Sequence, residues 1–147
     1  MEDKGPDTLI GYYIVSSGMS TRRVSIELPG VEHTHPIPAA CRVGSVLMTS
    51  GVSGKDPRTG KFSENIEGQC AQMFANVRQI LELAGAAPES VIKINVWIKD
   101  KALRPHLNKE WLAMFPDPRS RPARHTFAAS DLDAPMLVQC EVIAVVE

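Results

Sequence analysis

Hydrophobic and polar residues alternate along several short segments of this chain. The clearest case is VIKINVWIKD, residues 91–100, where every second residue is apolar. Such alternation is typical of a β-strand with one buried face, and we expect that face to contain Ile92, Ile94, Val96 and Ile98. Other alternating or apolar runs predict further strands, over residues 22–28, 42–51, 124–130 and 137–146. A short strand at Lys61–Phe62 is expected to pair back across the turn KDPRTGK.

Two segments have the period of an amphipathic helix. Residues 65–84 place apolar side chains along one stripe, and Gly85 follows where a helix often ends in a left-handed residue. A second helix is expected to begin at Pro105 and to end before Pro116. Its apolar stripe consists of Leu107, Trp111, Met114 and Phe115. The order of elements predicts an α+β sandwich, with two helices packed on one face of a mixed β-sheet.

The chain length favours a single domain. With 147 residues the protein can bury a substantial core without disulfides or a structural metal. We assign this domain to residues 21–147. Residues 1–20 contain the apolar run TLIGYYIV and then SSGMS, in which Met19 is a possible natural start. We therefore interpret residues 1–20 as an N-terminal extension, a remnant of expression or a functional arm.

Composition and charge exclude several classes of protein. The net charge of −1 and the small number of aromatic residues argue against nucleic acid as a partner. The sequence has no apolar run of membrane-spanning length and no secretory signal, so we expect no membrane partner. Three cysteines without CxxC spacing indicate a reduced, cytoplasmic protein rather than a disulfide framework.

The stretch SRPARHTFAAS contains the strongest candidate for chemistry. Arg124 opens an expected strand, although strands beside a packed core usually avoid a permanent charge unless an anion meets it. A guanidinium binds a carboxylate through two parallel hydrogen bonds. The alternative is a structural ion pair with Asp131 or Glu141. His33 and His35 have the spacing of a metal pair, but no third ligand accompanies them, so we expect no metal and no cofactor.

Several blocks of the sequence, at matching spacing, resemble the RidA/YjgF family of enamine and imine deaminases. These blocks are VLMTSG, DPRTG, LAGAAPESVIKINVWIKD, PAR at residues 122–124 and the closing CEVIAV, together with Gln69, Asn76, Asn108 and Phe115. The resemblance implies a chorismate-mutase-like fold and homotrimers with a barrel-like core. It also implies clefts between subunits, where Arg124 binds a small carboxylate. By the same resemblance Ser50, Gly51, Ile37, Asn108 and Thr126 border the cleft.

The sequence departs from the family pattern at positions that bear on catalysis. Gln139 stands where the family usually has a glutamate that positions or activates the attacking water. An amide can orient water but cannot accept its proton at neutral pH. Ile37 replaces an aromatic wall of the cleft, and His35 and His125 stand where members usually have no histidine. We therefore expect His35 or His125 to supply acid–base chemistry. A surface role for His35 and an interface role for His125 remain open, since regular alternation turns His125 away from Arg124.

The function that we expect is hydrolytic deamination, the cleavage of a C–N bond with release of ammonia. The substrate is a small carboxylate-bearing enamine or imine, either a reactive intermediate or a larger aminomuconate-like compound. The alternative is a non-catalytic, trimeric protein that binds small carboxylates and has a regulatory role. Gln139 is the residue that separates the two hypotheses.

Overall fold

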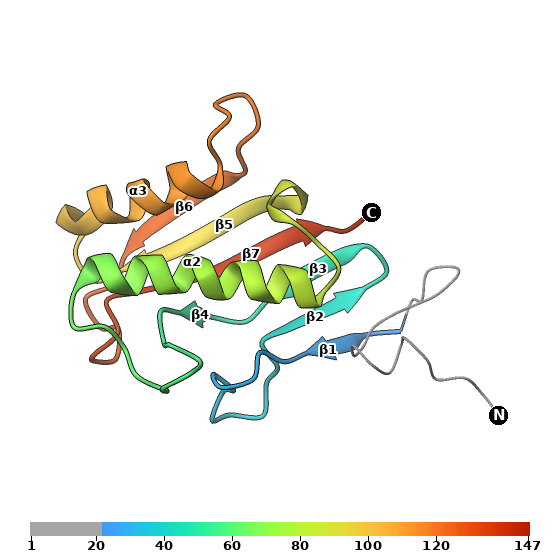
Figure 1. The fold of residues 1–147 in the computed structure, drawn as a ribbon, viewed down its shortest axis with the longest axis horizontal. Coiled ribbons are helices and arrows are strands. Elements are labelled where there is room, and N and C mark those ends of the chain that lie inside the picture. The colour runs from blue at the N-terminus through green and yellow to red at the C-terminus, as the bar shows by residue number, and fades with distance from the viewer. Residues whose placement is uncertain (1–21) are drawn as a thin grey trace.

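The computed structural model describes residues 22–147, so the expectations for residues 1–20 and for Met19 lie outside the described residues. Two long helices pack on one face of a mixed β-sheet, which confirms the predicted α+β sandwich (Figure 1). The strands are β1 (Val24–Ile26), β2 (Ala40–Val43), β3 (Val46–Thr49), β4 (Val52–Ser53), β5 (Val91–Ile98), β6 (Ala123–Ala128) and β7 (Val138–Val145). The helices are α2 (Ile66–Leu83) and α3 (Arg104–Met114), with short 3-10 helices at Pro88–Ser90 and Lys101–Leu103.

The sheet has the strand order β1-β2-β3-β7-β5-β6, and β4 pairs with β7 beside this path. Strands β5 and β6 are parallel, and every other pair is antiparallel. Helix α3 makes the crossover that a parallel pair requires, and β6 therefore becomes an edge strand beneath α3 (Figure 1).

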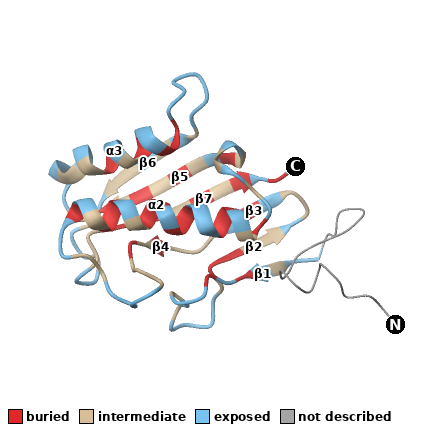
Figure 2. Cartoon of the chain, viewed as in Figure 1, coloured by how far each residue is buried: buried red, intermediate tan, exposed pale blue. Residues whose placement is uncertain are grey.

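Helix α2 forms where the apolar stripe predicts it. Asn65 caps its first turn, because the Asn65 side chain accepts a hydrogen bond from the Gly68 amide at 2.8 Å. The helix ends at Gly85, whose φ of 77° lies in the left-handed region. Figure 2 shows buried residues recurring along α2. Alternate residues of β5 and β7 meet it, and the core therefore lies between the helices and one face of the sheet.

The predicted strand over residues 42–51 is wrong. It is a hairpin of β2 and β3, because the two-residue turn Gly44–Ser45 reverses the chain between Val43 and Val46. The φ of 57° at Gly44 suits such a tight turn.

Two further details differ from the sequence pattern. A β-bulge between Val91 and Lys93 turns Ile92 outward, so Ile92 is 52% exposed and Val91 is buried in its place. The predicted strand at Lys61–Phe62 is reduced, within residues 22–147, to a single bridge between Lys55 and Phe62.

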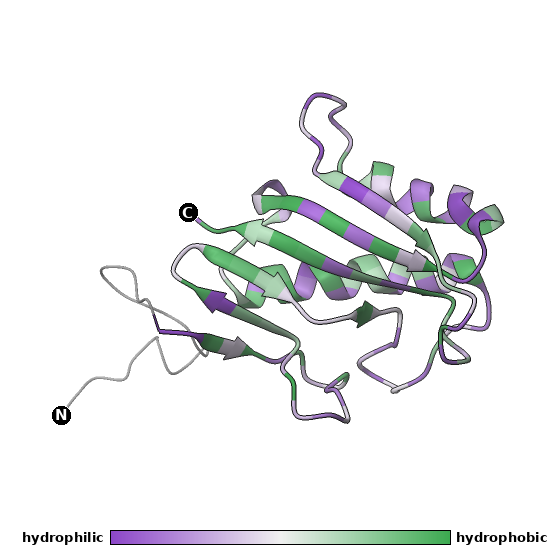
Figure 3. Cartoon of the chain, turned by 180° about the vertical axis from the view of Figure 1, so that it is seen from behind, coloured by the Kyte–Doolittle hydropathy of each residue, from purple (hydrophilic) through white to green (hydrophobic). Residues whose placement is uncertain are grey.

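The second face of the sheet carries no helix in the described part of the chain (Figure 3). Its apolar part contains large side chains on neighbouring strands: Val43, Val46, Met48 and Val145, each between 40% and 49% exposed. We call this surface the open face. No helix within residues 22–147 is long and apolar enough to cross a membrane.

Candidate active site

Arg124 lies near the start of β6 and points toward helix α3. It pairs in register with buried Ile94, so its side chain leaves the sheet on the helix-covered face. One guanidinium nitrogen, Nη2, donates a hydrogen bond to Asn108 Oδ1 at 2.8 Å. The guanidinium carbon lies 4.9 Å from the centre of the Trp111 ring, a cation–π contact. Asn108 and Trp111 therefore fix the direction of the Arg124 side chain.

The charge of Arg124 has no anionic partner among residues 22–147. The alternative of an ion pair with Asp131 or Glu141 is not realised. Glu141 lies on the open face, where it accepts a hydrogen bond from Asn95 Nδ2 at 3.0 Å. The second terminal nitrogen of Arg124, Nη1, is buried without a hydrogen-bond partner. Burial, and then the nearby charge of Arg104, hold the pKa of Arg124 below its usual range.

A buried donor on a cation is costly when it is unpaired, because desolvation is then not repaid by any contact. This wall of the protein is therefore suited to receive an anion. Thr126 lies on the same face as Arg124, since it pairs in register with buried Val96. We call Arg124, Asn108, Trp111 and Thr126 the arginine wall.

His125 points the other way, as alternation along the strand predicts. It pairs in register with Asn95 on the open face, and its ring stacks on Phe127 with 4.1 Å between ring centres. Phe127 in turn stacks on Trp97 at 5.5 Å. His125 is thus part of an aromatic row on the open face and does not belong to the arginine wall of its own chain.

A second group of predicted residues comes together around a hollow of about 360 Å³. His33, His35, Gly51 and Gln139 line it, together with Asp133 and Met136. Gly51 permits the close approach of Gln139, because a Cβ atom at residue 51 would stand 2.6 Å from Gln139 Nε2. We call His35, Gly51 and Gln139 the glutamine wall.

Ser50 and Ile37 have more limited roles at this wall. The Ser50 hydroxyl donates to the carbonyl of Pro38 at 2.8 Å, so the side chain anchors the preceding loop. Ile37 is 46% exposed and does not line the hollow. Their expected contacts with a substrate remain predictions.

Two buried amides of α2 hold the backbone around the glutamine wall. Gln69 is fully buried, donates to the carbonyls of Ser63 and Pro135, and accepts from the amide of Leu137. Asn76 donates to the carbonyls of Ser53 and Lys55. These bonds fix the loop before β7 and the chain beyond β4. The family resemblance singled out both residues, but it did not give these roles, and an amide on a helix is more often exposed.

The arginine wall and the glutamine wall do not meet within one chain. Gln139 lies on the open face, since its partner Trp97 does, whereas Arg124 lies on the helix-covered face. Two strand spacings separate β6 from β7, which is about 10 Å. Arg124 is level with Val142, three residues from Gln139, which adds about 10 Å along the strand. One small molecule cannot touch both walls of a single chain.

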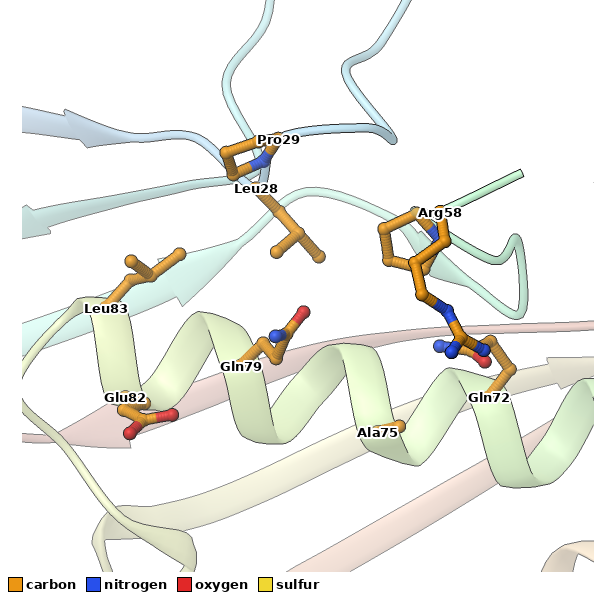
Figure 4. A pocket seen from close by; sticks show the side chains of 9 residues that line it. Leu28, Pro29, Arg58, Gln72, Ala75, Gln79, Glu82 and Leu83 are labelled. Atoms are coloured by element: carbon orange, nitrogen blue, oxygen red, sulfur yellow. The ribbon is translucent and has the colours of Figure 1, made fainter. Parts of the chain in front are cut away.

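A larger hollow lies elsewhere on the described residues. It is a groove of about 870 Å³ between α2, the end of β1 and the turn at residues 57–58 (Figure 4). Gln72, Ala75 and Gln79 of α2 line one side, and Leu28 and Pro29 line the other. It contains none of the predicted site residues.

Residues 22–147 contain no group of three or more histidine, cysteine, aspartate or glutamate side chains placed to hold a metal ion. The three cysteines are free, and Cys70 and Cys140 are buried. Burial raises the pKa of Cys70 to about 12 and also raises that of Cys140. Neither thiol is therefore suited to act as a nucleophile at neutral pH.

The fold and the arginine wall define the class: an α+β protein whose edge strand carries a half-buried arginine with one buried, unpaired nitrogen. A family model described as endoribonuclease L-PSP matches residues 31–146. The chain thereby belongs to the RidA/YjgF family, as the sequence motifs predict.

Individual relatives agree with this assignment. A RutC family protein of Aquifex aeolicus is 36% identical over 110 residues, which cover 75% of this chain and 88% of that protein. The 2-iminobutanoate/2-iminopropanoate deaminase of Salmonella typhimurium is 32% identical over 104 residues, which cover 70% of this chain and 81% of that protein. Imine deaminases thus occur within the family.

Among solved structures, TdcF of Escherichia coli with bound serine has a TM-score of 0.77 and 25% identity. The match covers 84% of this chain and 98% of that one. The likeness extends over nearly the whole of the described residues.

Proposed function

We propose that this protein is a hydrolytic deaminase of small carboxylate-bearing imines and enamines. The observation that carries the proposal is the Arg124 guanidinium, which is oriented by Asn108 and Trp111 and has a buried nitrogen without a partner. A substrate carboxylate supplies the missing acceptor and the missing charge together. The similarity to named imine deaminases, and to a structure that holds serine, supports a ligand of this kind.

The chemistry needs little beyond positioning and one proton transfer. An enamine first tautomerises to the imine by protonation at carbon. Water then adds to the C=N carbon, a proton moves from the water to the nitrogen, and the C–N bond breaks to give ammonia and a 2-oxo acid. Gln139 orients the water through its side-chain oxygen. His35, which lines the same hollow as Gln139, takes the proton and returns it to the leaving nitrogen.

We place the active site between two copies of the chain. The arginine wall of one subunit and the glutamine wall of the next enclose the substrate, because the two walls lie too far apart within one chain. The exposed apolar side chains of the open face are the surface that a homotrimer buries. Three free cysteines are consistent with a reduced, cytoplasmic enzyme.

One observation favours the alternative, a non-catalytic carboxylate-binding protein. Gln139 lacks the carboxylate that the family usually has at this position, and Glu141 cannot replace it while it is bound to Asn95. In that case Arg124 binds 2-oxo acids and no ammonia is released.

The first test measures ammonia release from 2-iminopropanoate, generated continuously from alanine by an amino-acid oxidase. We expect Arg124→Ala to lower kcat/KM at least about 100-fold, since two charge-assisted hydrogen bonds are lost. Arg119→Ala, which removes an exposed arginine nearby, is the control and retains full activity. Binding of 2-oxobutanoate by calorimetry without any turnover would favour the alternative. Unchanged turnover in both His35→Ala and His125→Ala would exclude the histidine hypothesis.

A mixing experiment tests the two-chain site. Arg124→Ala and Gln139→Leu chains are unfolded together, refolded as mixed oligomers and assayed. Each junction between chains combines one arginine wall with one glutamine wall, so about a quarter of the junctions in an equal mixture contain both native residues. We expect about a quarter of native activity from two inactive variants. No recovery would refute a site built from the arginine wall of one chain and the glutamine wall of the next.

A further inference from the structure

Arg104 stands beside Arg124 and has no role in the proposed reaction so far. It is the first residue of α3 and lies one helical turn before Asn108, the residue that holds Arg124. Residues four apart on a helix have Cβ atoms about 5–6 Å from each other. Arg104, Asn108 and Trp111 therefore follow one another along one side of α3, and Arg124 lies against the last two.

The position of Arg104 is unfavourable for the protein alone. A helix N-terminus carries a partial positive charge that favours acidic residues, yet the first turn of α3 has none. Arg104 also repels Arg124, whose pKa it lowers. Its side chain donates a long hydrogen bond, from Nε to the carbonyl of Lys101 at 3.3 Å.

Neither arginine makes an ion pair with a carboxylate in the described part of the chain. Two like charges are thus held near each other, at the positive end of a helix, without a carboxylate to balance them. An arrangement of this kind is stabilised when an anion with two charges binds it.

We propose that the substrate is a dicarboxylate, an imine or enamine whose first carboxylate binds Arg124 and whose second carboxylate binds Arg104. This inference rests on the proposed function and assigns its substrate class. Arg104 is exposed, at the outer end of the arginine wall, so the second carboxylate lies at the mouth of the site and the C=N carbon lies deeper. The aminomuconate-like compounds considered from the sequence belong to this class, whereas 2-iminopropanoate does not.

The test compares two imines that differ by one carboxylate. 2-Iminoglutarate is generated from glutamate, and 2-iminopentanoate from norvaline, each by an amino-acid oxidase, and ammonia release is measured above the spontaneous rate. We expect the native enzyme to prefer 2-iminoglutarate. Arg104→Gln should raise KM for 2-iminoglutarate and lower its kcat/KM about 10- to 100-fold. The same variant should leave kcat/KM for 2-iminopentanoate unchanged.

Lys109→Gln is the matched control, because it removes a positive charge from an exposed position of the same helix. It should change kcat/KM for neither imine. Equal native rates on the two imines, or an equal loss on both in Arg104→Gln, would overturn the dicarboxylate proposal and leave the deaminase proposal intact.

A binding measurement keeps the two proposals separable. If neither imine is hydrolysed, the deaminase proposal fails, and calorimetry with 2-oxoglutarate and 2-oxopentanoate still tests Arg104. Tighter binding of 2-oxoglutarate that disappears in Arg104→Gln would support the dicarboxylate site. Equal binding of the two oxo acids by the native protein would refute it.

Discussion

Replacing Gln69 by methionine should destabilise the fold through the loss of specific hydrogen bonds, with little change in side-chain volume. Gln69 is fully buried and makes three hydrogen bonds, to the backbone of Ser63, Pro135 and Leu137. Methionine fills the same space and offers none of them. Because Pro135 is exposed and Ser63 and Leu137 are half-buried, water can reach part of the freed backbone.

The lower end of the penalty for an unpaired polar group therefore applies, about 1 kcal/mol for each freed group. The expected loss is about 3 kcal/mol in the free energy of unfolding. For a domain of this size the melting temperature should fall by about 10 °C. A loss of this size is a large fraction of the 5–15 kcal/mol by which domains are usually stable.

The assay is urea unfolding monitored by tryptophan fluorescence. It is run at one fixed protein concentration, because an oligomer gains stability with concentration. Gln79→Met is the matched control, since it makes the same chemical change at an exposed position of the same helix. It should change the free energy of unfolding by less than about 0.5 kcal/mol. If the free energies of unfolding of the two variants differ by less than 1 kcal/mol (about the value of one hydrogen bond), the three hydrogen bonds do not stabilise the protein as reasoned.

Two further predictions concern close packing and thiol reactivity. Gly54→Ala should lower the free energy of unfolding by about 1–3 kcal/mol in the same urea assay, because its Cβ would stand 2.3 Å from the carbonyl oxygen of Gln69; an unchanged midpoint would contradict this. Iodoacetamide at pH 8 should label Cys41 first in the native protein, since Cys41 is half-buried whereas Cys70 and Cys140 are buried and burial raises the pKa of both. Mass spectrometry of the digested protein identifies which cysteine is labelled at each time. Early labelling of Cys140 would show that the core opens.

The sequence predicted the long regular elements well, because their periodicity is set by burial on one side. Helix α2 and the strands β5 and β7 are of this kind. The hairpin at Gly44 was missed because its turn has only two residues and lies inside a largely apolar run. Ile92 was misplaced for a related reason: a bulge shifts the alternation by one residue without changing the composition.

The candidate site was only partly predictable. Arg124 was identifiable from its unusual place in a strand, and alternation alone placed His125 on the opposite face. The contacts that Arg124 makes with Asn108, 16 residues earlier in the chain, and with the Trp111 ring depend on how α3 lies over β6. The contribution of Arg104 depends on the same packing. Local sequence does not determine such distances between elements.

Strand β6 presents Arg124 to one side of the sheet and His125 to the other, on consecutive residues. The peptide unit between them is rigid, so a shift of the backbone at Arg124 must also move His125 and the ring stacked on it. Capture of a ligand on one side is thereby mechanically linked to the opposite surface. In the homotrimer proposed above, that opposite surface would face a neighbouring chain, so a shift at Arg124 would reach the next subunit.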